Sequence, residues 1–265
     1  MFKHLLTYAI SLLLILFFSA YLISDEIKDE NAKEVIEEQT KEEEEKEEYI
    51  EDKVKDFDSF TGFIQAYQDP ETSSLYFSLD ENQLNKEFIY FAHVKDGVVA
   101  ARRNRGSYLD NGVFKFEKHF DTIRLIRVNT AFSLDETSAL SKSSGANISN
   151  SVIQVFPINS MNKEENKFLI NVSSFFISEA LTPIKPIPNP DYPPPDFMWG
   201  QLSVEKSRIK STHNYPKNTD VEVEYVFENP PSTEYEEEDA ADPRNISIFL
   251  RYSFIEMPVN DFEPR

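Results

Sequence analysis

The stretch "TDVEVEYVF", residues 219–227, decides the fold class of this chain. Val221, Val223, Tyr225 and Phe227 fall on one side of an extended backbone, while Glu222 and Glu224 fall on the other. This alternation of apolar and charged residues has the period of a β-strand and does not fit a helix. The stretch therefore predicts a strand with one face in a core and the other face in water.

The same period recurs along the chain from about residue 57 onward. It predicts further strands at residues 62–68, 75–79, 87–94, 113–119, 123–128, 152–156, 167–175, 202–210 and 246–255. Helical signals are few: one or two turns after Asp80, which would be the N-cap, and another short helix near Asp135. Many short strands separated by turns predict a mainly β fold, either an antiparallel sandwich or an open, barrel-like sheet with few short helices.

A proline-rich segment interrupts the strands, with seven prolines between Pro183 and Pro195. Proline fixes φ and donates no backbone hydrogen bond, so this segment predicts an extended strap on the surface. Its simplest role is a stiff connection across the sheet, with Trp199 fixing its end in the core. The alternative is a docking ligand for a groove in another protein.

The N-terminus predicts export. Residues 5–23 are uncharged and twelve of these nineteen are Leu, Ile or Phe, which is enough apolar length to span a bilayer. We interpret residues 1–24 as a transmembrane anchor or a cleaved signal peptide, so the rest of the chain would be in the cell envelope, on the periplasmic side, either anchored to the inner membrane or secreted. Residues 25–56 hold 16 acids and 6 lysines and predict an acidic, partly helical or disordered tether. Residues 57–265 would form the β domain.

The chain's formal net charge of −20 argues against a nucleic-acid partner, which would need a basic surface. The absence of cysteine excludes disulfides, thiolate zinc sites and cysteine nucleophiles. The chain also has no G-x-S-x-G elbow and no glycine-rich phosphate loop.

Only two groups of residues remain as candidates for chemistry. His93 and His119 lie on predicted strands and would need to meet across a sheet to bind a metal. Arg102, Arg103 and Arg105 are the one concentrated basic group, and they would either clamp a ligand carboxylate or form ion pairs with neighbouring acids. The residues alone predict no catalytic constellation.

Several phrases in order resemble the N-terminal domain of unknown function of bacterial exported zinc-dependent metalloproteases. The resemblance begins at "FTGFIQAYQDPETSSLYFSLDENQLNKEFIYFAHVKDG" and continues through Arg105-Gly106, "VFKFEKHFDTIRLIRVNTAF", "SVIQVFPI" and "FLINVSSFFISEA". Two later phrases fit best. "SRIKSTHNYPKNTDVEVEYVFE" and "RYSFIEMPVNDFEPR" match that family's pattern at Ser207, Ile209, Pro216, Asn218, Thr219, Ser253, Pro258, Pro264 and Arg265. The strand position where the family has Asp is Asn171 here.

The resemblance implies a non-catalytic N-terminal module, truncated at its C-terminal end. Its partner would be a C-terminal metallopeptidase domain of the same protein, whose HExxHxxGxxH motif would hold the zinc. This chain lacks that motif, so no catalytic residue and no cofactor is assigned to it, and peptide substrate would be a further partner. Two alternatives stay open: a standalone membrane-tethered domain that binds peptide or glycan, and an independent enzyme that uses His93 and His119.

Overall fold

The structure is a computed structural model that describes residues 49–131, 148–162, 165–187, 190–191, 197–230 and 240–259. One compact unit spans Tyr49–Arg265. The predicted anchor, most of the predicted tether and the predicted helix near Asp135 lie outside the described residues. Within the described ranges, no helix has both the length and the apolar character needed to cross a membrane.

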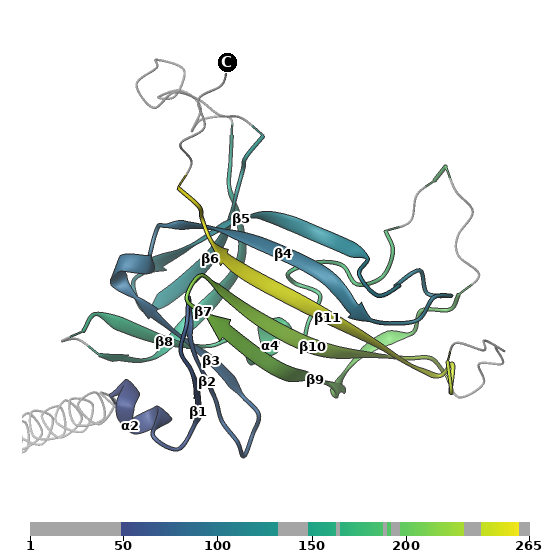
Figure 1. Cartoon of the computed structure of the whole chain (residues 1–265), viewed down its shortest axis with the longest axis horizontal. Helices are drawn as coiled ribbons and strands as arrows, with labels where there is room; N and C mark the ends of the chain where they lie inside the picture. The colour runs from purple at the N-terminus through teal and green to yellow at the C-terminus, as the bar shows by residue number, and fades with distance from the viewer. Residues whose placement is uncertain are drawn as a thin grey trace, which may run out of the picture. The chain divides into compact units, whose positions relative to one another are not determined.

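A single sheet of eleven strands dominates the unit, in the order β1-β2-β3-β8-β7-β6-β5-β4-β11-β10-β9 (Figure 1). The strands are β1 Asp58–Phe60, β2 Gln65–Gln68, β3 Leu75–Asp80, β4 Glu87–Asp96, β5 Tyr108–His119, β6 Thr122–Val128, β7 Ser151–Asn162, β8 Lys167–Asn171, β9 Gln201–Tyr215, β10 Asn218–Glu228 and β11 Asn245–Glu256. Every neighbouring pair is antiparallel. The sheet curls into a nearly closed barrel, so the barrel-like alternative among the sequence predictions is confirmed.

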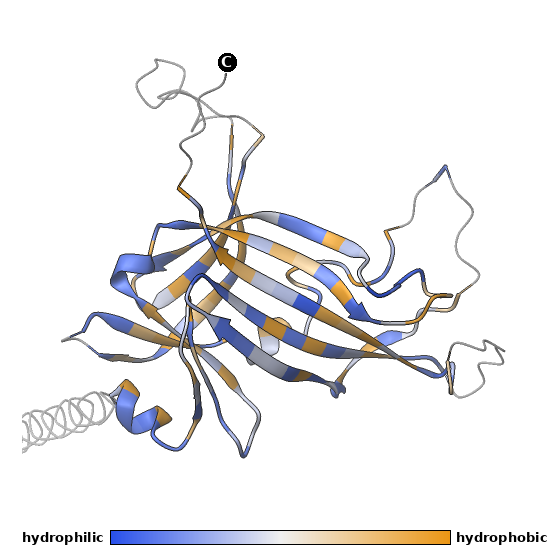
Figure 2. Cartoon of the chain, viewed as in Figure 1, coloured by the Kyte–Doolittle hydropathy of each residue, from blue (hydrophilic) through white to orange (hydrophobic). Residues whose placement is uncertain are grey.

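The alternation seen in the sequence becomes an inner and an outer face. Val221, Val223, Tyr225 and Phe227 of β10 are all fully buried, and the buried residues of β11 and β4 pack beside them in the same core. Figure 2 shows the corresponding change between apolar and polar residues along these strands. Burial of the apolar face drives this arrangement, at roughly 25 cal/mol per Å² of apolar surface removed from water.

A short helix fills part of the barrel interior. Helix α4, Ser173–Phe176, follows β8 and lies behind β10 in Figure 1. The Phe176 ring packs against the rings of Phe77 and Phe254, with centroids 5.9 and 6.0 Å away. The predicted strand at residues 167–175 is therefore wrong beyond Asn171. The Asn171 side-chain oxygen accepts a 2.9 Å hydrogen bond from the Ser173 amide, which turns the chain out of the sheet so that Phe175 and Phe176 can both be buried.

Two further short helices border the sheet. Helix α2, Ile50–Val54, comes from the last part of the predicted tether and buries Ile50 and Val54 against Leu169 of β8. The 3-10 helix η1, Glu81–Gln83, follows β3 and confirms the predicted turn after Asp80. The Gln83 side-chain oxygen accepts a 2.9 Å hydrogen bond from the Asp80 amide, which is half of a capping box.

The described part of the proline-rich segment is held at both ends. Ile184 is fully buried near its start. Beyond its end, the Trp199 ring packs edge-on against Phe227, at 5.1 Å between centroids. This agrees with the predicted role of Trp199 as the residue that fixes the end of the strap.

The barrel is closed by side chains where β1 meets β9. The Asn214 side-chain amide donates hydrogen bonds to the carbonyls of Phe60 and Ile64, at 2.7 and 2.6 Å. The Phe63 amide donates to the Tyr215 carbonyl at 2.8 Å. Because β1 has only three residues, these bonds take the place of a longer ladder between the first and last strands of the sheet.

Strand β9 is the long edge strand of this sheet, and its pairing with β10 has two register shifts. At one of them the Ser207 hydroxyl accepts a 3.0 Å hydrogen bond from the Val226 amide and donates a 2.6 Å bond to the Ser203 carbonyl. A side chain therefore replaces a ladder bond that the bulge removes.

Candidate functional site

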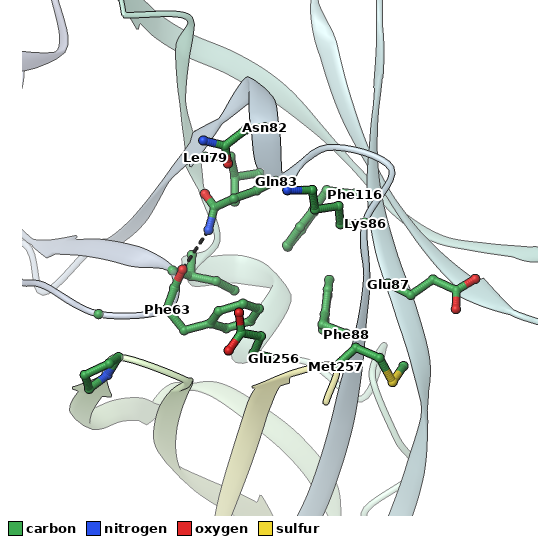
Figure 3. A pocket seen from close by; sticks show the side chains of 13 residues that line it. Phe63, Leu79, Asn82, Gln83, Lys86, Glu87, Phe88, Phe116, Glu256 and Met257 are labelled. Atoms are coloured by element: carbon green, nitrogen blue, oxygen red, sulfur yellow. Dashed lines mark hydrogen bonds between the residues drawn. The ribbon is translucent and has the colours of Figure 1, made fainter. Parts of the chain in front are cut away.

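A cavity of about 640 Å³ opens at one end of the barrel, and we call it the mouth cavity (Figure 3). It lies where the β1–β2 loop, η1, the start of β4, the β9–β10 turn and the end of β11 meet. Its lining residues are Gly62, Phe63, Ile64, Leu79, Asn82, Gln83, Lys86, Glu87, Phe88, Phe116, Pro216, Glu256 and Met257. Barrel mouths of this size are frequent ligand sites in β proteins.

The inner wall of the mouth cavity is aromatic and aliphatic. Ile64, Leu79, Phe88 and Phe116 are all buried in the core. Ile64 lies in the loop just before β2, and the other three lie at or near the ends of their strands. The Phe88 ring stacks on Phe116 at 5.3 Å between centroids and meets Phe63 edge-on at 6.3 Å. This wall suits an apolar or aromatic side chain, because it offers stacked rings and no charge.

The rim of the mouth cavity is polar. The Gln83 amide donates a 2.7 Å hydrogen bond to the Phe63 carbonyl and joins η1 to the β1–β2 loop (Figure 3). Lys86 is exposed and has no ion-pair partner among the described residues, whereas Glu256 pairs with Lys217 at 3.5 Å. Figure 3 shows the Glu87 side chain directed away from Phe63. The described lining contains no Ser, Thr, Cys or His, and its charged groups are Lys86, Glu87 and Glu256.

On one side of the mouth cavity, the β1–β2 loop packs closely against the β9–β10 hairpin. A Cβ atom on Gly62 would lie 2.2 Å from the Asn214 side-chain oxygen and 2.7 Å from the Tyr215 carbonyl. The β1–β2 loop can therefore approach the β9–β10 hairpin only because residue 62 has no side chain.

The structure does not bring the two candidate metal-binding histidines together. His93 is opposite Tyr108 of β5, whereas His119 is at the far end of β5, opposite Thr122. Within the described ranges, no group of three His, Asp or Glu side chains could hold a metal ion. His213 Nε2 lies 3.2 Å from the Ser211 hydroxyl, and none of the described carboxylates forms an ion pair with His213. A Ser-His-acid triad is therefore not formed there.

His93 belongs instead to a charged cluster on the outer face of β10, β11 and β4. Arg251 lies beside His93 in register and donates two hydrogen bonds to the Glu222 carboxylate, which Lys95 also approaches at 3.2 Å. Burial, together with the Arg251 charge, lowers the pKa of His93, and its buried Nδ1 atom has no hydrogen-bond partner among the described residues. Burial alone would raise the pKa of Glu222, but hydrogen bonds from Arg251 and Lys95 lower it below its usual value.

The three predicted ligand-contacting arginines have three different environments. The Arg103 guanidinium donates a 2.6 Å hydrogen bond to the Ile184 carbonyl and lies 6.0 Å from the centre of the Trp199 ring, so it braces the strap. Arg105 pairs with Asp96 at 3.2 Å on the surface. Arg102 is exposed, with a left-handed backbone at φ 54°. Arg102 and Arg105 remain accessible to a ligand, whereas Arg103 is engaged within the domain.

The mouth cavity could not be predicted from the sequence. Its residues come from strand ends and loops that are far apart in the chain, and the pairing of β4 with β11 is what assembles them. One local signal was available, since the Asp80-to-Gln83 spacing is that of a capping box and places η1 at the rim.

Residues 106–265 match the family described as "Domain of unknown function (DUF5117)". The match spans more than half of the chain and includes β5 to β11, whereas β1 to β4 precede it and complete the same barrel. No curated protein and no solved structure matches the chain.

Proposed function

The chain belongs to the DUF5117 family, and from this premise we propose that it is the non-catalytic module of an exported zinc-dependent metallopeptidase. In this role it packs on the catalytic domain and shapes the substrate cleft through the mouth cavity. The ordered series of phrases that resemble such proteins supports the assignment. The lining of the cavity is consistent with it, because its inner wall provides apolar contact.

The position of the cavity carries the proposal. Glu256 ends β11 and Met257 follows it, and both line the cavity. They directly precede residues 258–265, which resemble the Pro-Arg segment of the metalloproteases. A domain that follows this segment in the chain would therefore start within reach of the cavity.

The first test is to read the genomic DNA beyond the Arg265 codon. An open frame that continues and encodes HExxHxxGxxH is the expected result. An immediate stop codon would contradict the assignment and leave a standalone tethered binding domain as the function.

The second test places a photo-crosslinking amino acid at position 257, and at position 120 as the control. Met257 lines the cavity, whereas Phe120 is 80% exposed in the β5–β6 turn. Crosslinks to the catalytic domain are expected from position 257 only. Equal crosslinking from both positions would show that the cavity is not the contact.

The purified chain itself should bind no stoichiometric zinc and hydrolyse no peptide. Zinc content by elemental analysis and cleavage of a fluorogenic peptide library check this directly. Hydrolysis that a chelator abolishes would contradict a non-catalytic role.

A further inference from the structure

A second hollow, of about 440 Å³, lies outside the barrel against β2 and β3, and we call it the polar hollow. Its side chains come from the outward positions of these strands, which alternate with the buried residues Ala66, Phe77 and Leu79. It meets the mouth cavity along the Phe63–Gln83 hydrogen bond, since both residues line both spaces. Every lining residue except Gly62 and Phe63 has a side chain that can form hydrogen bonds.

Several of these groups have no partner within the described structure. The side chains of Thr61 and Asn82 are exposed and form no hydrogen bond to the described residues. The Ser78 hydroxyl is also without a described partner, although Ser78 is only 4% exposed. The Ser78 hydroxyl is open to the base of the hollow, where a ligand or solvent can form the hydrogen bond that the described residues do not supply.

The neighbouring polar groups are held in place by the fold. Gln83 uses its oxygen for the Asp80 amide and its nitrogen for the Phe63 carbonyl. The Gln65 amide donates a 2.9 Å hydrogen bond to the Ser59 hydroxyl. The free groups of the hollow are therefore presented from a rigid frame, which reduces the entropy lost when a ligand binds.

The charges of the polar hollow are balanced, which indicates a neutral ligand. Asp80 and Lys167 are its only charged residues and lie opposite each other in the pairing of β3 with β8. Lys167 forms its ion pair with Glu165, and the Asp80 side chain accepts the Gln83 backbone N–H in the capping box. Both charged groups are therefore engaged within the fold, which leaves hydroxyl and amide groups as the free ones.

An extended peptide fits the polar hollow less well. A peptide that adds to a sheet needs a run of open backbone groups, but the bordering strand β1 has three residues and its Phe60 carbonyl already accepts from Asn214. Side-chain pockets would need apolar surface, and Phe63 is the one apolar side chain in the lining. Hydroxyl and amide groups beside the half-buried ring of Tyr67 suit a sugar, whose hydroxyls both donate and accept.

We propose that the polar hollow is a binding site for a neutral saccharide, with Thr61, Ser78 and Asn82 forming the ligand hydrogen bonds. This site shares Phe63, Asn82 and Gln83 with the rim of the mouth cavity but lies outside the barrel, and it does not depend on the proposed metallopeptidase role.

Titration of the full chain with neutral oligosaccharides of glucose, mannose, galactose and N-acetylglucosamine tests the proposal, by calorimetry and saturation-transfer NMR. At least one should bind in the range up to about 10 mM. Ser78→Ala and Asn82→Ala should each weaken that binding about tenfold, because each removes a ligand hydrogen bond. The control Asn104→Ala changes an exposed asparagine outside the hollow and should alter the affinity less than about twofold.

The absence of binding by every neutral oligosaccharide would overturn the proposal. So would binding that both hollow variants leave unchanged, or peptide binding that only these variants weaken. A lack of crosslinking from position 257 would count against the metallopeptidase role and would leave saccharide binding in the polar hollow unaffected. The two proposals can therefore fail independently.

Discussion

The Thr219 hydroxyl donates a 2.6 Å hydrogen bond to the side-chain oxygen of Asn214. This bond fixes which way the Asn214 amide faces, so that its nitrogen reaches the Phe60 and Ile64 carbonyls. The Thr219 hydroxyl also accepts from the Ile64 amide at 3.0 Å. Two side chains of one hairpin therefore close the barrel and support the loop that lines both the mouth cavity and the polar hollow.

Replacement of Asn214 by Ala should lower the free energy of unfolding by about 2–4 kcal/mol, since it leaves two carbonyls and the Thr219 hydroxyl without their partner. Urea denaturation followed by circular dichroism measures the change. Asn104→Ala is the control and should stay within about 0.5 kcal/mol of the parent chain. A similar small effect of Asn214→Ala would mean that these bonds do not hold the barrel closed.

Gly62→Ala should destabilise the chain by about 2 kcal/mol or more, because the new methyl group would overlap Asn214 and the Tyr215 carbonyl. Gly106→Ala is an informative comparison. Gly106 has φ +81° and open space around its Cα, so its substitution adds only backbone strain of about 1 kcal/mol. Thermal denaturation measures both variants. A smaller fall in melting temperature for Gly62→Ala than for Gly106→Ala would show that residue 62 is not crowded by Asn214 and Tyr215.

Two buried tyrosines of the core, Tyr225 and Tyr90, should respond differently to loss of the hydroxyl. The Tyr225 hydroxyl donates to the Phe176 carbonyl and lies 2.7 Å from the Tyr252 hydroxyl, whereas the Tyr90 hydroxyl has no partner in the described part of the chain. Tyr225→Phe should therefore cost about 1–3 kcal/mol, and Tyr90→Phe should be neutral or stabilising. Chemical denaturation of both variants gives the comparison, and equal losses would refute the assignment of hydrogen bonds.

Acid should destabilise the fold in two stages. The pKa of His93 is lowered by burial and by Arg251, so the folded state resists protonation while the unfolded chain protonates near its ordinary value of 6.5. The stability that neutral His93 contributes is present above that value and is lost as the pH falls from it through the lowered folded pKa. The pKa of Glu222 is also lowered, so its contribution is present above its ordinary value of 4.5 and is lost as the pH falls through the folded pKa.

His93→Gln should remove the first stage, and melting temperatures measured between about pH 7 and pH 5 should then vary less than in the parent chain. Glu222→Gln keeps His93 but removes a carboxylate that raises the His93 pKa, so the first stage should persist or deepen in this comparison variant. An unchanged pH slope in His93→Gln would exclude His93 as the titrating group.

Most strands could be predicted from the sequence because their alternation is local. The predicted strands at residues 87–94, 113–119 and 123–128 correspond to β4, β5 and β6, and the structure extends the first two by a few residues. The predicted strand at 62–68 starts only at Gln65, because Phe63 and Ile64 are needed at the mouth. The neighbours of each strand could not be predicted, since alternation carries no information about which strands pair.

The candidate sites could not be predicted from the sequence either, because they depend on contacts between distant parts of the chain. Arg103 looked like a ligand-binding residue in the sequence, but its partner Ile184 is far along the chain and only the fold brings them together. No sequence pattern marks Ser78 as a binding residue, because a serine on the outward face of a strand is ordinarily solvated. Its burial depends on residues 59–67 folding beside it.

The bulged edge of β9 has a consequence for how molecules meet one another in concentrated solution. An open, regular edge strand invites a second molecule to pair with it, which is a common route to aggregation. The Ser207 hydroxyl accepts a hydrogen bond from the Val226 amide where the ladder between β9 and β10 is broken. Lys206 and Arg208 add charged side chains on the same strand. A second chain therefore meets an irregular, charged border, and this protects the domain from self-assembly through its longest exposed strand.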